Sequence, residues 1–116
     1  SSIPPILPKN STAPLLVEDV FNCLNQNNIS YYLIKQCCLD AICQRNITTI
    51  QFSICNPEDI NKINKLFPNN NFEIEIGKVS STKLHNYKNI LIKVPFPVIR
   101  YLEKTFNKSW SELNNV

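Results

Sequence analysis

Residues 48–76 decide the fold of this chain, and they read TTIQFSICNPEDINKINKLFPNNNFEIEI. Apolar and polar side chains alternate in residues 48–55, which is the period of a β-strand with one buried face. Asn56 then offers a capping side chain and Pro57 suits the first position of a helix, so we expect a helix to begin here. After a turn of proline and asparagine, residues 72–76 alternate again. This stretch therefore predicts a strand, a helix and a second strand.

The sequence on both sides of this stretch continues the mixture of helices and strands. We expect a helix from Pro14 to about Asn25, a strand at residues 30–35, a helix at residues 36–45, a strand at residues 88–94 and a final helix after Pro97. Residues 83–87 are polar and are expected to form a loop around His85, the single histidine. The predicted order, α-β-α-β-α-β-β-α, indicates an α/β (α+β) domain with a small mixed four-stranded sheet and three to four helices.

The length of the chain bounds its organisation. A chain of 116 residues and 13.4 kDa can bury one modest core, so we expect residues 15–116 to form a single domain. Residues 1–14 contain four prolines and are expected to form an extended N-terminal arm. No apolar run approaches the roughly 20 residues that cross a bilayer, and no membrane span is expected.

The composition excludes several classes of nucleotide-binding enzyme. Gly77 is the single glycine. Phosphate-binding loops need several glycines for tight turns and close backbone approach, so P-loops, dinucleotide-binding motifs and kinase-type lids are excluded. The net charge of +3 is too small to imply a polyanionic partner. Because no catalytic signature is complete, we expect a binding domain without a cofactor, whose partner is another protein.

Five cysteines lie in the first half of the chain, and their odd number leaves at least one thiol unpaired within it. They are Cys23, Cys37, Cys38, Cys43 and Cys55. The spacing of Cys38 and Cys43 resembles half of a zinc site, but a structural zinc site normally has a second short-spaced pair. Cysteine is among the most buried residue types, so buried free thiols are favoured, with disulfides and zinc as alternatives.

Four N-glycosylation sequons begin at Asn10, Asn28, Asn46 and Asn107. Together with the cysteines they favour a secreted protein or one in the lumen of the secretory pathway. A cytoplasmic protein is the alternative, because the 17 asparagines of this chain produce sequons by chance.

Two acidic residues offer a possible site for metal chemistry. Glu73 and Glu75 are two residues apart in a predicted strand, so their carboxylates lie on one face and could bind a divalent cation. A small metal-dependent enzyme is therefore one alternative function. A solvated sheet face is the simpler interpretation of the same spacing.

A second alternative is a basic face that contacts nucleic acid. Residues 78–108 contain one acid, Glu103, and seven basic residues: Lys78, Lys83, Lys88, Lys93, Arg100, Lys104 and Lys108. Surfaces that bind nucleic acid combine such residues with aromatic rings. The spacing spreads these seven over a strand, a loop and a helix, so nucleic acid is not the favoured partner.

Two segments, about half of the chain, resemble a known family. Residues 15–45 combine a helix with the motif Leu24-Asn25-x-x-x-Ile29-x-Tyr31-Tyr32-Leu33 and the turn Gln36-Cys37-Cys38-Leu39. Residues 91–110 run Leu-Ile-Lys-Val-Pro, then Tyr101-Leu102-Glu103 and Phe106-Asn-Lys-Ser-Trp110. These segments resemble the opening and closing elements of LicD-type and fukutin-type transferases.

The resemblance implies a nucleotidyltransferase fold that has lost its catalytic groups. In the family, a Gly-Ser turn approaches the phosphate, and acidic pairs on the following strand hold magnesium for phosphoryl transfer. Here Gln36-Cys37 stands in place of Gly-Ser, and residues 49–54 contain no carboxylate. Phe106-Asn107 replaces the Tyr-Gly of the family, a mild change because Asn tolerates a left-handed helix end. The resemblance thus implies a shortened, catalytically degenerate member, and no catalytic residue is carried over.

Overall fold

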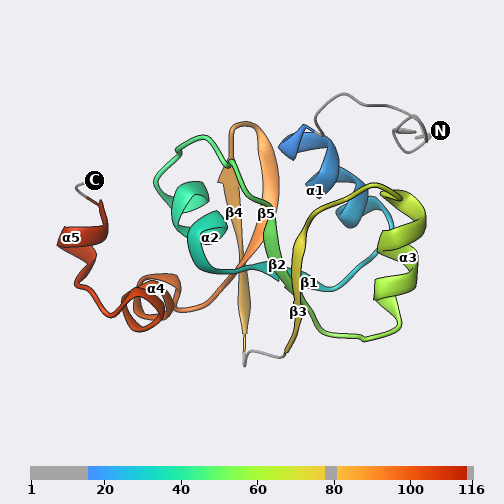
Figure 1. Ribbon diagram of the computed structural model, residues 1–116. Helices are drawn as coiled ribbons and strands as arrows, with labels where there is room; N and C mark the ends of the chain where they lie inside the picture. The colour runs from blue at the N-terminus through green and yellow to red at the C-terminus, as the bar shows by residue number, and fades with distance from the viewer. Residues whose placement is uncertain (1–15, 78–80, 115–116) are drawn as a thin grey trace.

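The computed structural model describes residues 16–77 and 81–114, which form a mixed α+β domain (Figure 1). The helices of these residues are α1 (Val17–Gln26), α2 (Lys35–Ile42), α3 (Asp59–Leu66), α4 (Val98–Phe106) and α5 (Trp110–Asn114). The strands are β1 (Tyr31–Leu33), β2 (Gln51–Ile54), β3 (Glu73–Ile76), β4 (Thr82–Tyr87) and β5 (Ile90–Pro95). The predicted α+β class is confirmed, while the expected arm at residues 1–14 lies outside the described residues.

Strand β2 is the centre of a three-stranded sheet with the order β1-β2-β3. It pairs antiparallel with β1 and parallel with β3, so that Phe52 lies between Leu33 and Ile74 in the register. Helices α1 and α3 lie on one side of these strands, and α2 and α4 lie on the other (Figure 1). All four residues of β2 are buried, because helices cover both of its faces.

The core on the side of α1 and α3 is built from aromatic rings. The ring of Phe52 packs edge-on against those of Phe21, Tyr31 and Phe72, with centroids 5.8–6.5 Å apart. Phe67, at the end of α3, packs edge-on against Phe72 at 5.3 Å. Such edge-to-face pairs are favoured by the ring quadrupoles. The alternating apolar residues of the sequence thus meet the apolar stripes of two helices.

The prediction of a single four-stranded sheet is wrong, because β4 and β5 form a separate antiparallel hairpin. Residues 83–87 belong to β4 and are not a loop, and the strand predicted at 88–94 begins at Ile90. Lys88 and Asn89 form the connecting turn, with φ values of 46° and 73°. The hydropathy pattern of the sequence does not reveal β4, because the polar residue His85 occupies a position on the inner face of this strand. Its Nε2 lies 3.3 Å from the carbonyl oxygen of Ala41.

The predicted order of elements also lacks the last helix, α5. Helix α4 ends at Asn107, whose left-handed backbone has a φ of 54°. Ser109 directly precedes α5, and its carbonyl oxygen accepts hydrogen bonds from the N–H groups of Glu112 and Leu113. A helix of five residues is too short to show a periodic pattern in the sequence. The observed order is therefore α-β-α-β-α-β-β-β-α-α.

Candidate functional site on the polar face of the sheet

The three-stranded sheet has a polar face on the side of α2 and α4. We define the polar sheet face as Tyr32 of β1, Gln51 and Ser53 of β2, and Glu73 and Glu75 of β3. The register sets Gln51 beside Glu73, and Ser53 beside both Glu75 and Tyr32. Because side chains alternate along a strand, these five point to the same side. The sequence correctly places Glu73 and Glu75 on one face.

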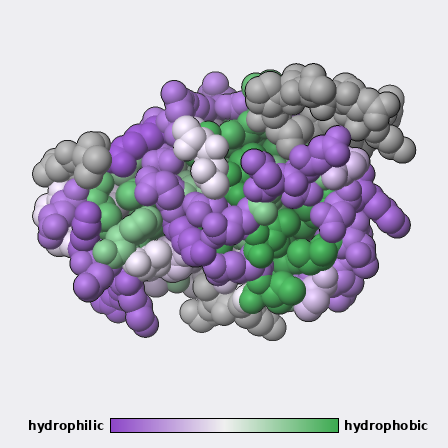
Figure 2. All heavy atoms as spheres, viewed as in Figure 1, coloured by the Kyte–Doolittle hydropathy of each residue, from purple (hydrophilic) through white to green (hydrophobic). Residues whose placement is uncertain are grey.

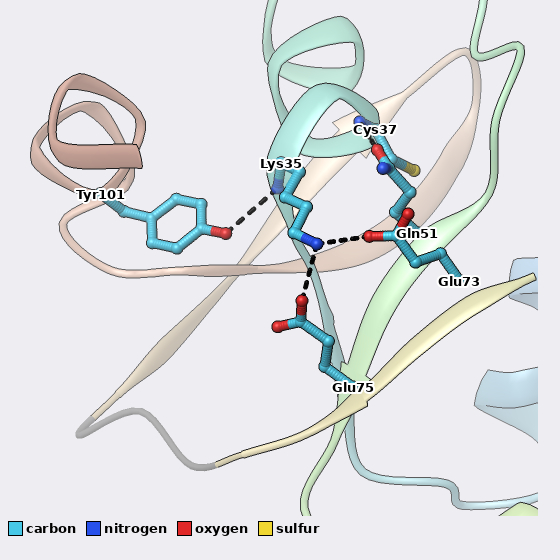
Figure 3. A network of polar contacts seen from close by, with 6 residues as sticks. All are labelled: Lys35, Cys37, Gln51, Glu73, Glu75 and Tyr101. Carbon is cyan, nitrogen blue, oxygen red and sulfur yellow. Dashed lines mark hydrogen bonds and ion pairs between the residues drawn. The ribbon is translucent and has the colours of Figure 1, made fainter. Parts of the chain in front are cut away.

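Lys35, at the start of α2, lies between the two glutamates (Figure 3). Its Nζ is 2.5 Å from Oε2 of Glu73 and 2.7 Å from Oε2 of Glu75. Hydrogen bonds to Glu73 and Glu75 raise the pKa of Lys35, and Lys35, followed by Gln51, lowers the pKa of Glu73. The ammonium thus occupies the position between the carboxylates where a metal ion would be held. Two carboxylates share one ammonium, which leaves one negative charge on the cluster.

The first turn of α2 is held by side chains of the protein itself. The N–H of Cys37 donates to the buried Oε1 of Gln51 at 3.0 Å, and the N–H of Lys35 donates to the hydroxyl of Tyr101 on α4 at 3.1 Å. The first N–H groups of a helix have no partner within the helix and often bind anions. Here two of them are already bonded. Lys35 has a left-handed backbone with a φ of 54°, a conformation that glycine adopts most readily.

Ser53, Tyr32 and Gly77 lie close together at the end of the polar sheet face where β3 ends. Ser53 is 2% exposed, and its Oγ is the one buried side-chain oxygen or nitrogen in the described residues that lacks a hydrogen-bond partner. A Cβ on Gly77 would lie 3.3 Å from both this Oγ and the hydroxyl of Tyr32. The single glycine of the chain therefore serves close approach of β3 to its neighbours.

The carboxylates and cysteines that the structure describes do not gather into a metal site. Within residues 16–77 and 81–114, no group of three or more His, Cys, Asp or Glu side chains could hold a metal ion. All five cysteines are free; Cys23, Cys37 and Cys38 are buried, and Cys43 and Cys55 are half-buried. Burial raises the pKa of Cys37 to about 12, and it also raises the pKa of Cys23 and of Cys38.

Thiol labelling of the native protein is expected to separate these two groups. Cys43 and Cys55 should react rapidly with a disulfide reagent such as dithionitrobenzoate at pH 8, because reagent and water reach them. The three buried thiols should react only as the protein opens, since the thiolate is the nucleophile and burial disfavours it. The measurement is the stoichiometry of released chromophore with time, with guanidinium-unfolded protein as the five-thiol reference. Rapid labelling of all five in the folded state would contradict this arrangement.

The structure places two of the predicted basic residues on opposite faces of the hairpin. Lys83 and Lys93 occupy adjacent register positions of the hairpin, so their side chains point to opposite faces. The ammonium groups of Lys83, Lys88 and Lys93 lie 5.4–5.7 Å from the ring centroids of Phe96, Tyr87 and Tyr31, respectively. Arg100 and Lys104 are exposed on α4, Lys108 is exposed just after it, and Lys78 lies outside the described residues.

Three of the four sequons begin at exposed positions outside the strands and helices. Asn28 lies in the turn after α1, Asn46 in the loop before β2, and Asn107 at the end of α4. The side-chain oxygen of Asn46 accepts a hydrogen bond from Lys88. Asn10 lies outside the described residues. Glycosylation at these positions stays a prediction.

Lys35, Gln51 and Tyr101 belong to the candidate site but were not singled out by the sequence. A glutamine beside the apolar residues of a predicted strand is one signal for Gln51, because a buried amide needs partners. Nothing local marks Lys35 or Tyr101. Their partners lie 38 and 66 residues away, respectively, along the chain.

No family model matches this chain, and no match was found among the curated proteins or the solved structures with which it was compared. The resemblance to LicD-type and fukutin-type transferases therefore stays a prediction. In the part of the chain that the structure describes, none of the helices is both long and apolar enough to span a membrane.

Proposed function

We propose that this chain is a non-catalytic binding domain, derived from a LicD-type or fukutin-type nucleotidyltransferase fold, that binds another protein. The observation that carries the proposal is the ammonium of Lys35 between Glu73 and Glu75, within 2.7 Å of both. A two-metal phosphoryl transfer site needs free carboxylates for its cations. In this chain the carboxylates of the polar sheet face already have a cation from the protein.

The residues at the positions where the family binds magnesium and phosphate support the same proposal. Gln51 and Ser53 stand on β2, the strand that carries acidic pairs in the family, and neither can bind magnesium as a carboxylate does. The amide of Gln51 instead accepts the N–H of Cys37, and Tyr101 accepts that of Lys35. A helix start whose N–H groups are bonded internally has little to offer to a phosphate. Apart from the unpartnered hydroxyl of Ser53, the polar groups at the start of α2 are therefore bonded within the protein.

The sequons bear on the location of the protein, and the carboxylates and basic residues bear on the rival functions. The sequons favour a secreted protein or one in the lumen of the secretory pathway, with a cytoplasmic protein as the alternative. A small metal-dependent enzyme built on Glu73 and Glu75 is the rival function, and it requires Lys35 to leave the pair. For a nucleic-acid-binding face, the separated basic residues of the hairpin offer no support.

Calorimetry with ATP or CTP and Mg²⁺ tests the proposal on the unmodified chain. We expect no saturable heat up to millimolar nucleotide, because neither the metal nor the phosphate position is free. The Glu73→Gln, Glu75→Gln double variant is expected to behave identically. Saturable micromolar binding that disappears in the double variant would instead establish the metal-dependent rival.

The role of Lys35 can be tested separately with Mn²⁺ as the probe. Lys35→Met leaves two neighbouring carboxylates without their counter-ion, so this variant is expected to bind Mn²⁺ more tightly than the unmodified chain. Lys104→Met, which changes an exposed lysine on α4, is the matched control and should not change Mn²⁺ affinity. Equal affinity of all three proteins would show that Lys35 does not block the pair.

A further inference from the structure

Strand β3 forms an open edge of the three-stranded sheet. The N–H groups of Glu73 and Gly77 donate toward β2, to the carbonyl oxygens of Ile50 and Ile54 at 3.0 and 3.1 Å. Successive backbone groups point to opposite sides of a strand, so those of Ile74 and Ile76 point away from β2. Among the described residues, no strand pairs with this side of β3.

This edge carries only some of the usual devices that prevent strand addition. Proteins commonly block an edge with proline, lysine, a bulge or a covering helix, or keep it short and charged. β3 is short and carries two glutamates, but it contains no proline or lysine, no described strand pairs with its outer side, and Ile76 is 58% exposed. Figure 2 shows apolar surface gathered over β3 and toward α3, with hydrophilic surface on the opposite side of the strand. The described part of this edge is therefore exposed, with a polar face and an apolar face.

The two faces of the edge have different chemistry. The side chains of Glu73 and Glu75 are 46% and 50% exposed and keep one negative charge after pairing with Lys35. Ile74 and Ile76 lie on the other face. A strand that pairs with β3 continues the same alternation, because side chains opposite one another across a ladder share a face. Its residues beside the glutamates should be basic, and those beside the isoleucines should be apolar.

We propose that the free edge of β3 binds an extended segment of another protein in which basic and apolar residues alternate, by strand addition. This inference rests on the proposed binding function and names the chemistry of the partner. A second copy of the chain fits the edge less well. Antiparallel pairing of two β3 strands about Ile74 would set Glu73 of one copy against Glu75 of the other, and like charges in opposite positions are destabilising.

The test is an NMR titration of the ¹⁵N-labelled chain with the peptide acetyl-Lys-Val-Lys-Val-Lys-Val-amide. We expect saturable shifts confined to the amides of residues 73–77, of which Gly77 is easily followed as the single glycine. The peptide acetyl-Lys-Lys-Lys-Val-Val-Val-amide has the same composition and charge without the alternation. It should bind at least about tenfold more weakly, a difference of about 1.4 kcal/mol.

Variants of the chain separate the contributions of the apolar face and of the charged face. Ile76→Lys places a charge on the exposed apolar face of the edge and should weaken binding of the alternating peptide by about tenfold or more. Glu75→Gln should weaken binding about two- to fivefold, the size of an exposed ion pair, and reduce its dependence on salt. Glu58→Gln changes an exposed glutamate before α3 and should have no effect.

Three outcomes of the titration would overturn the proposal: equal affinity for both peptides, shifts that centre outside residues 73–77, or no binding at millimolar peptide. Sedimentation of the free chain tests the other possible occupant of the edge, which is a second copy of the chain. If the chain dimerises and Ile76→Lys abolishes the dimer, the edge binds a second copy and the proposed partner is wrong. Failure of the peptide to bind leaves the nucleotide and Mg²⁺ titrations unaffected, so the proposed function is judged independently.

Discussion

Phe52→Ala is expected to lower the free energy of unfolding by about 3–5 kcal/mol, the usual cost of removing a buried ring. Phe52 lies in the central strand, has no exposed surface, and packs against Phe21, Tyr31 and Phe72. Since small domains unfold with about 5–15 kcal/mol, this change removes a large part of the total. Urea denaturation followed by circular dichroism measures the loss.

An exposed apolar residue provides the control for this change. Leu91 of β5 is 53% exposed, so Leu91→Ala should change the free energy of unfolding by no more than about 0.5 kcal/mol. Phe52→Leu, which keeps most of the apolar volume, should fall between the two. If Phe52→Ala were as stable as Leu91→Ala, the aromatic cluster would not be the core of the domain.

Tyr87→Phe is expected to cost about 1–3 kcal/mol, although it removes only one oxygen atom. The hydroxyl of Tyr87 donates to the carbonyl oxygen of Arg45 at 2.7 Å and accepts the N–H of Ile47 at 3.3 Å. The side chain is 1% exposed, so water cannot easily replace either bond. Because the ring remains, the change isolates the hydroxyl that ties the hairpin to the loop before β2. Thermal and urea unfolding of the variant measure the cost.

Tyr101→Phe is the matched control for Tyr87→Phe. Its hydroxyl accepts a bond from the N–H of Lys35, and its side chain is only half-buried. Water can take over this bond, so we expect a smaller loss than for Tyr87→Phe. The reverse order of the two variants would show that the contact between α4 and the start of α2 matters more than the hairpin contact.

The elements with a regular local pattern could be predicted from the sequence. The alternation around Phe52 and in residues 72–76 corresponds to β2 and β3, with β2 shorter than the predicted 48–55. The apolar spacing after Pro57 corresponds to α3, which begins at Asp59. These patterns persist because each strand or helix buries one face against the core, and the period of the apolar residues reports that face.

The elements without such a pattern could not be predicted. His85 of β4 faces inward but bonds to the end of α2, so a polar residue occupies a position where the pattern requires an apolar one. Lys88 and Asn89 have left-handed backbone in the turn. Asn tolerates this conformation, but a lysine in the sequence gives no indication of it. The sequence therefore predicts a single four-stranded sheet, whereas the structure has a three-stranded sheet and a separate two-stranded hairpin.

The candidate site shows the same division most clearly. The sequence by itself determined that Glu73 and Glu75 share a face, because the two-residue period of a strand is a local property. It also excluded glycine-rich phosphate loops, since one glycine cannot build them. Only the tertiary structure decided that the ammonium of Lys35 lies between these carboxylates and that Gln51 holds the first turn of α2. Those contacts depend on the register of β2 against β3 and on where α2 starts, and a one-residue shift of either strand would turn the polar residues to the opposite face.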